Sequence, residues 1–406
     1  MALILAAEFY VTKNGFLPES EPSSTFRNRY YQPWERIATE LPALLKLRNY
    51  RSAVTKLPNL STAYLHSKEE WRLAYSILAF LCHAYIWGGD EPLEDLPTQL
   101  AVPFLAVSTY VEIPPVLTCA AVNLWNYRLR GTDLCNPDHL EILHTFTGTD
   151  SESWFLRIGI AIEATGGKLM EHLIDAMEAT TLQQYGPITN ALWAMAGCLR
   201  DITTLLGRIH EKCDPSTFCH QIRPFYAGSR NMNGAGLPRG VFYHEGAGKG
   251  EWRQLPGGSN GQSSLLQLLD IVIGVGYCAK PKLFHLDTRQ CTPGPHRRFL
   301  EYMANKGSIR ELALQDIHTE EHSGLREAYT SAAEELTNFR SKHIQIVTRY
   351  VAMQLKQPWH KSTGSHALPQ LLSSGLRDAS PKGTTGSDVL GFLKDMRNET
   401  TTARII

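Results

Sequence analysis

The sequence at residues 323–356 is SGLREAYTSAAEELTNFRSKHIQIVTRYVAMQLK. Side chains suited to one buried face recur in it every three or four positions, at Leu325, Ala328, Ala332, Leu336, Phe339, His343, Ile346 and Tyr350. This spacing predicts one long α-helix with His343 on its buried face. Ser323 is the expected N-cap, and Pro358 is expected to stop the helix soon after Lys356.

Three cations, Arg340, Lys342 and Arg349, lie close to His343 on the polar side of the predicted helix. A buried imidazole between cations suits an anionic ring that carries a metal ion, so His343 is a candidate axial ligand of a haem iron. A single histidine on an apolar helix face is nevertheless more often a hydrogen-bonded core residue. The local pattern leaves both interpretations open.

The composition is that of an ordinary globular protein. The chain has 406 residues, of which 43% are hydrophobic and 20% charged, and its formal net charge is zero. This length allows two or three domains around a large core. Because there is no basic excess, neither nucleic acid nor an anionic membrane surface is an expected partner. The most apolar helical stretches, residues 73–87 and 265–275, are too short to span a bilayer or are interrupted by Asp270.

The eight cysteines are scattered along the chain without a C-x-x-C pair. This spacing fits neither a zinc ribbon nor a secreted disulfide scaffold, so reduced thiols are expected. The apolar run from Ala2 to Ala7 has no basic segment before it. It ends at Glu8, so it is shorter than the apolar region of a signal peptide. These features predict a cytoplasmic protein.

Helical periodicity recurs along most of the chain, and the alternation typical of strands is almost absent. Helices are predicted at residues 67–87, 116–127, 154–164, 168–178, 188–213, 265–275 and 388–397. Residues 101–113 are predicted to be extended, and the polar run at 147–153 is the best candidate for a domain boundary. The predicted fold class is therefore mainly α.

Residues 227–261 contain ten glycines together with Pro238 and Pro256. A loop of this length is usually functional or disordered, and its aromatic side chains favour an ordered one. Three roles stay open for the glycines: tight turns, a backbone surface against a flat ligand, or a phosphate cradle at the helix that follows. The phosphate role has the least support, because neither a Gly-Lys-Ser/Thr ending nor a preceding strand is present.

Several motifs in order resemble those of one family, the indoleamine 2,3-dioxygenases, which are haem enzymes of tryptophan catabolism, and the style is that of the fungal members. The resemblance covers nearly the whole chain. It rests on AVPF at 101–104, IPPVL at 113–117, IRPF at 222–225, GGSNGQSS at 257–264, PHRRF at 295–299, RSKHIQIV at 340–347 and GT at 383–384.

The resemblance implies two helical domains, a small one at residues 1–148 and a large one at 149–406 that holds haem b, with a mobile loop at 360–384. It implies that His343 is the proximal ligand of the haem iron. It also implies that Arg340 meets a haem propionate and that Asp270 is an acidic partner nearby. Asp270 is flanked by apolar residues on its predicted helix, where an unpaired carboxylate would be costly, so a partner is expected for it.

On the distal side of the haem, the resemblance implies pocket aromatics at Phe155 and Phe218 and a substrate-carboxylate arginine at Arg223. It also implies that Ser259 is the serine over the haem edge and that Thr384 belongs to the loop that closes over substrate. Arg223 suits its role because a guanidinium can form a bidentate pair with a carboxylate. Without the resemblance, Phe155 and Phe218 would be interpreted as core residues.

Four positions depart from the family pattern. Gly159 stands where a serine is common, Cys119 where animal members have a tyrosine, Cys219 where an aromatic is usual, and Thr385 where a glycine is usual. Each of the first three is expected to enlarge or depolarise the distal pocket. A substrate bulkier than tryptophan, or weak turnover of tryptophan, is therefore a hypothesis.

The expected function is cleavage of the indole C2–C3 bond of L-tryptophan by O2, which gives N-formyl-L-kynurenine and uses an external reductant. No protein general base is required for this chemistry. The protein is expected to be a cytoplasmic monomer. One alternative is a haem-binding paralogue that oxidises another indole derivative or senses a ligand without catalysis. Another is a helical interaction protein in which His343 is structural.

Overall fold

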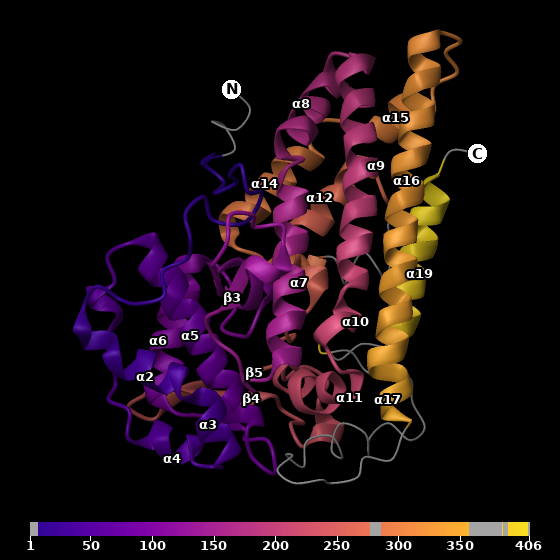
Figure 1. The fold of residues 1–406 in the computed structure, drawn as a ribbon. Coiled ribbons are helices and arrows are strands. Elements are labelled where there is room, and N and C mark those ends of the chain that lie inside the picture. Colours follow the sequence, from indigo (N-terminus) through magenta and orange to yellow (C-terminus); the bar gives the residue numbers. More distant parts are fainter. Residues whose placement is uncertain (1–6, 277–285, 357–383, 385–388, 405–406) are drawn as a thin grey trace.

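Helices make up most of the structure. The computed structural model describes residues 7–276, 286–356, 384 and 389–404 (Figure 1). Within these residues the mainly α fold class is confirmed, but the helical domains that the resemblance implies are not all-helical, because two small sheets are present. Thr385 and almost all of the loop predicted at 360–384 lie outside the described residues. None of the described helices is both long and apolar enough to cross a membrane.

The first part of the chain forms short helices around a long buried one. They are α2 (Gln32–Thr39), α3 (Leu41–Lys46), α4 (Tyr50–Thr55), α5 (Lys68–Trp87) and α6 (Thr98–Val111). The helix predicted at 67–87 is confirmed as α5, and Ser67 and Glu70 form a capping box at its start. The prediction that residues 101–113 are extended is wrong. Most of it lies in α6, where packing of the apolar side chains against α5 outweighs the helix-breaking effect of Pro103.

A β-hairpin lies within the segment that was predicted to be a glycine-rich loop. Its strands are β4 (Val241–Gly246) and β5 (Lys249–Arg253), and β4 also pairs in parallel with β1 (Asp95–Leu96). Gly246, Ala247 and Gly248 all have positive φ angles at the turn between the strands, a conformation that glycine adopts without strain.

The helix predicted at 116–127 is mostly wrong, because the chain forms one π-helical turn there and then enters the second sheet at Tyr127. This sheet pairs β2 (Tyr127–Leu129) with β3 (Leu140–Ile142), and only a single π-helical turn, Ala120–Leu124, precedes it. The buried Asn126 amide donates to the His144 carbonyl and accepts from the His144 N–H, which fixes the two segments beside each other. This long-range pairing ends the helix.

The second part of the chain is a bundle of long helices together with several short ones (Figure 1). The helices are α7 (Asp150–Gly167), α8 (Met170–Thr181), α9 (Tyr185–Gly207), α10 (Ile209–Lys212), α11 (Pro215–Thr217), α12 (Ser264–Ile273), α14 (Gly294–Ala304), α15 (Ile309–Ala313), α16 (Glu320–Val347), α17 (Met353–Leu355) and α19 (Val389–Ala403). In Figure 1, α16 runs alongside α9, and the shorter α19 packs against the middle part of α16. This packing explains why α16 needs one continuous apolar face.

The helix that carries His343 begins earlier than predicted. Thr319 is its N-cap, because the Thr319 hydroxyl accepts a hydrogen bond from the His322 N–H, so the N-cap predicted at Ser323 is wrong. The helix continues through a π-helical turn, Thr348–Ala352, into α17. Its predicted end close to Lys356 is confirmed.

The buried apolar side chains form two clusters. One lies among α2 to α7 and also takes in residues 222–243, and the other lies among α7 to α9, α12 and α14 to α16. Phe155 and Phe218 pack against both clusters. The division at residue 148 stays a prediction, and the segment at 222–243 belongs to the first cluster although it follows α9 in the sequence.

A buried histidine of α5 joins two segments of the first cluster. His83 Nε2 accepts a hydrogen bond from the Leu117 N–H at 2.9 Å, and His83 Nδ1 lies 2.7 Å from the Phe225 carbonyl oxygen. These partners require a neutral ring that is protonated at Nδ1. Burial lowers the pKa of His83 from 6.5 to about 4.

Because the folded pKa of His83 lies below its unfolded value, this residue stabilises the fold above about pH 6.5, and the contribution is lost as the pH falls towards 4. We expect a loss of about 2 kcal/mol from this residue between pH 7.5 and pH 5, measured by urea unfolding at both pH values. A His83→Gln variant should lose that part of the pH dependence. An identical pH dependence in the variant would contradict the prediction.

Candidate active site

A mostly apolar cavity lies at the junction of the two clusters, where α7, α12, α16 and α19 meet the segments around residues 119–123, 218–226 and 258–261. Nine of the predicted site residues line it, namely Cys119, Phe155, Phe218, Arg223, Ser259, Asp270, Arg340, His343 and Thr384. The fold thus brings together residues that are more than 200 positions apart in the sequence.

His343 has the properties that a metal ligand needs. His343 is only partly exposed, and it is one of the residues that line the cavity. Burial, with a smaller contribution from the Arg340 charge, lowers the pKa of His343 to about 4, so the ring is neutral at physiological pH. No hydrogen bond joins this ring to any other residue that the structure describes. The core interpretation of His343 would require such a bond, whereas an axial ligand needs an unoccupied nitrogen.

Arg340 is buried rather than solvated on the polar side of the helix, so that part of the sequence-based placement is wrong. Its guanidinium forms an ion pair with the Asp270 carboxylate on α12 and donates to the Met396 carbonyl of α19 at 3.0 Å. The partner expected for Asp270 is therefore confirmed. This pair holds α12, α16 and α19 together one turn from His343 and places a cation at the cavity wall.

Removing one partner of this ion pair should be costly, because it leaves the other charge buried. We expect Asp270→Ala to lower the free energy of unfolding by about 3–5 kcal/mol, measured by urea denaturation. The double variant Asp270→Ala with Arg340→Met should recover part of this loss, because no unpaired charge remains. Additive losses in the double variant would show that the two residues do not act as a pair.

The aromatic wall of the cavity is formed by Phe155 of α7 and Phe218, which begins a π-helical turn. Their ring centroids lie 4.9 Å apart, and the Tyr350 ring of the α16 extension lies 5.9 Å from Phe218. Tyr350 is held in place because its hydroxyl donates to the Cys213 carbonyl at 2.8 Å. Contacts from both clusters therefore limit the movement of the two phenylalanines.

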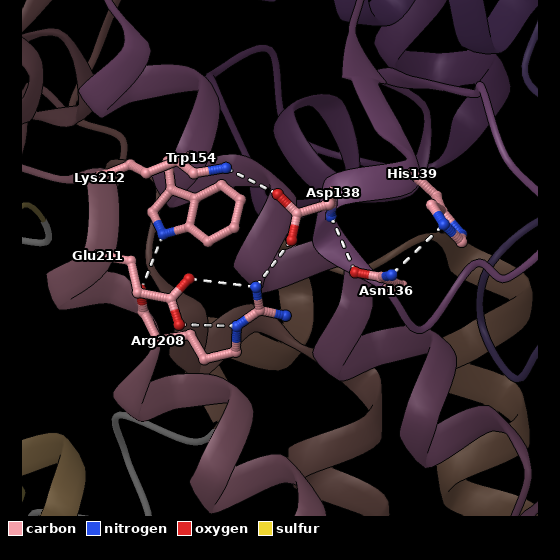
Figure 2. Close-up of polar contacts among 7 residues, drawn as sticks. All are labelled: Asn136, Asp138, His139, Trp154, Arg208, Glu211 and Lys212. Atoms are coloured by element: carbon pink, nitrogen blue, oxygen red, sulfur yellow. Dashed lines mark hydrogen bonds and ion pairs between the residues drawn. The ribbon is translucent and has the colours of Figure 1, made fainter.

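A polar cluster outside the cavity secures the base of this wall (Figure 2). The Trp154 indole N–H donates to the Arg208 carbonyl at 2.8 Å, and Arg208 and Lys212 both form ion pairs with Asp138. Hydrogen bonds and charges from Lys212 and Arg208 lower the pKa of the Asp138 carboxyl. The cluster ties the segment before β3 to the helix that carries Phe155.

Arg223 follows the same π-helical turn and projects into the cavity. It is buried, and desolvation lowers the pKa of its guanidinium, although an arginine stays charged under physiological conditions. A buried cation at the wall of an apolar cavity is suited to bind an anionic group of a ligand.

The glycine-rich turn at 257–261 forms another side of the cavity. A Cβ atom on Gly257 would lie 2.2 Å from the Tyr226 carbonyl oxygen, so close backbone packing requires glycine there. Gly258, Ser259 and Gly261 line the cavity, as the ligand-facing role requires. Thr384 contacts this turn, since its hydroxyl donates to the Gly258 carbonyl at 2.6 Å.

The start of α12 does not favour the phosphate role. The Ser263 hydroxyl accepts a hydrogen bond from the Leu266 N–H, so the helix caps itself, as the serine-rich sequence predicts. The Gln262 side chain is also used within the protein, because it accepts from the Cys119 N–H and donates to the Gly257 carbonyl.

Two of the departures from the family pattern do not line the cavity. Gly159 lies behind the side chain of Asn123, and a Cβ atom at Gly159 would be 3.0 Å from the Asn123 amide nitrogen. The small residue does not simply enlarge the cavity, because a polar amide lies against it. Cys219 is buried next to Arg223 and is also absent from the cavity lining. Cys119 does line the cavity, and burial raises the pKa of its thiol.

Sequence reasoning missed several cavity residues. The most polar of them are Asn123, Asn260 and Gln267, and Phe392 of α19 adds an aromatic ring. Asn123 belongs to a segment for which an ordinary helix was predicted. No local signal in the sequence distinguishes it from a core or surface asparagine.

Comparison with known proteins shows the family of the chain. A family model described as indoleamine 2,3-dioxygenase matches residues 5–403. The chain belongs to the indoleamine 2,3-dioxygenase family. It is 38% identical to an indoleamine 2,3-dioxygenase of Penicillium citrinum over 96% of this chain and 86% of that protein.

Two further relatives carry different substrate names. The chain is 34% identical to an indoleamine 2,3-dioxygenase of Saccharomyces cerevisiae, over 95% of this chain and 90% of the relative. It is also 34% identical to a 6-hydroxytryptophan 2,3-dioxygenase of Fusarium equiseti, over 95% of this chain and 94% of the relative. The protein is therefore a dioxygenase of a family whose relatives differ in the indole that they are named for.

Proposed function

We propose that the protein is a haem-dependent dioxygenase that cleaves the indole C2–C3 bond of L-tryptophan and forms N-formyl-L-kynurenine. The observation that carries this proposal is the neutral His343 imidazole, which has no hydrogen-bond partner among the described residues, at a cavity that also contains Arg223 and the Phe155–Phe218 wall. A structural histidine would not explain why these residues share one cavity.

The described residues fit a haem b group. His343 would supply the axial ligand, and the buried Arg340–Asp270 pair would supply a cation for a propionate. The apolar walls and the glycine-rich backbone at 258–261 suit the flat macrocycle. Bound haem, reduced by an external donor, would supply the activation of O2 that the protein side chains cannot provide.

The remaining side chains would bind and orient the substrate. The Arg223 guanidinium would form a bidentate pair with the substrate carboxylate, which fixes one end of tryptophan. Phe155 and Phe218 would contact the indole ring and exclude water from it. Ser259 would line the haem site, and Thr384, whose hydroxyl donates to the Gly258 carbonyl, would help to close the pocket. No protein group has to remove a proton in this arrangement.

A second candidate is oxidation of another indole derivative by the same haem site. It is favoured by Asn123, a polar group in a mostly apolar cavity. The similarity to a 6-hydroxytryptophan 2,3-dioxygenase supports it further. A haem protein that senses a ligand without catalysis has no such observation in its favour.

The proposal is tested with the purified protein, haem, a reductant and labelled O2. Incubation with L-tryptophan should give a product that has gained both labelled oxygen atoms, detected by mass spectrometry. A protein that shows a haem absorption band but leaves every indole unchanged would support ligand sensing instead. If the protein does not bind haem, neither the dioxygenase function nor ligand sensing through haem is possible.

A further inference from the structure

We infer that Asn123 determines substrate specificity by hydrogen-bonding a hydroxyl group on the benzo ring of the indole. The inference rests on the proposed function, because it concerns the substrate of the same cavity. It names the substrate class as ring-hydroxylated tryptophans.

The Asn123 side chain has unused hydrogen-bonding capacity. The residue is only 5% exposed and lines the cavity. Its amide nitrogen contacts the Cys119 sulfur at 3.5 Å, and no described residue donates a hydrogen bond to its Oδ1 atom. A thiol sulfur is a weak acceptor, so this contact satisfies little of the amide. A buried amide in this state is costly unless a ligand or water completes its hydrogen bonds.

Gly159 provides the space that this amide occupies. A Cβ atom at Gly159 would lie 3.0 Å from the Asn123 nitrogen and 3.2 Å from Oδ1, closer than ordinary packing allows. Gly159 is within α7, where glycine is less favourable than alanine. The pairing of the two residues therefore puts a polar group at a wall that Cys119, Val122 and Phe155 otherwise make apolar or weakly polar.

A hydroxyl group matches the Asn123 amide because it can donate to Oδ1 and accept from the amide nitrogen. Arg223 lines the same cavity and would hold the carboxylate end of the substrate. The hydroxyl must then be on the ring rather than on the side chain of the substrate. Unsubstituted tryptophan would leave the amide without a partner, which is a recognised basis of discrimination.

The test is calorimetric titration of the haem-loaded protein with 5-, 6- and 7-hydroxytryptophan. Each is compared with the methyltryptophan that carries its methyl group at the same ring position. The methyl compound matches the hydroxyl in size but forms no hydrogen bond. For at least one position we expect the hydroxyl compound to bind roughly tenfold more tightly in the wild type. Asn123→Leu should remove this difference, and the ratio of the two kcat/KM values should fall by a similar factor.

A second pair of variants keeps Asn123 in place. Gly159→Ala adds a methyl group against the amide and should reduce the preference for the hydroxyl compound. Gly197→Ala is the matched control on α9, because its Cβ would meet only the Arg200 guanidinium at 3.8 Å. It should leave the preference unchanged. This comparison decides the question if Asn123→Leu does not fold.

The inference is overturned if no hydroxytryptophan binds more tightly than its methyl counterpart in the wild type, or if the preference persists in Asn123→Leu. Failure of the proposed function looks different. In that case no indole is consumed with O2, although the binding preference and its loss in the variants are still measurable.

Discussion

Replacing His343 with alanine is expected to abolish haem binding and, with it, dioxygenase activity. The imidazole is the only unpartnered nitrogen ligand that the described part of α16 presents to the cavity. The variant should purify without the Soret band that the wild type shows after incubation with haem. Product formation from L-tryptophan should fall by at least about a thousandfold, since no other side chain supplies O2 chemistry.

Gln345→Ala is the matched control for this variant, because Gln345 is exposed on the same helix. It should retain both the Soret band and the activity. Urea unfolding of His343→Ala should show that the fold is preserved. A folded His343→Ala protein with the wild-type haem spectrum would exclude His343 as the axial ligand.

Replacing Arg223 with leucine is expected to lower kcat/KM for L-tryptophan by roughly a hundredfold or more. Charge-assisted hydrogen bonds contribute about 1.5–3 kcal/mol each, and a bidentate pair contains two of them. Tryptamine has the same indole ring without the carboxylate. Its kcat/KM should therefore change much less, and steady-state measurements on both substrates check the prediction.

The comparison between the two substrates separates binding from structural damage. Arg223 is buried close to Cys219, so its replacement also alters packing there. Equal losses for tryptophan and tryptamine would indicate such damage and would contradict a carboxylate contact. Arg223→Lys keeps the charge but loses the planar fork, so it should recover only part of the activity.

Local sequence patterns predicted the features that depend on neighbouring residues. The three- and four-residue spacing around His343 predicted a helix with that residue on its inner face, and α16 confirms the helix. The helix predicted at 67–87 begins after the capping residue Ser67, because a cap needs only a hydroxyl and the N–H groups that follow it.

Long-range pairing was less predictable. The strand β4 pairs with β1 at Phe242 and Asp95, so its existence depends on residues that are almost 150 positions apart. The same reason explains why Arg340 was expected on a polar surface but is buried. Arg340 is buried because it contacts Asp270 and α19. The spacing of residues within α16 cannot predict contacts with these distant segments.

The sequence by itself determined a mainly helical chain with His343 on the inner face of a helix, and a family resemblance that named nine of the residues lining the cavity. Only the tertiary structure decided that Asn123 reaches the cavity while Gly159 stays behind it. Helix and cap formation depend on contacts a few residues apart, which a sequence displays directly. The polarity of a cavity wall depends on which side chains from distant elements meet, and that is settled by packing of the whole fold.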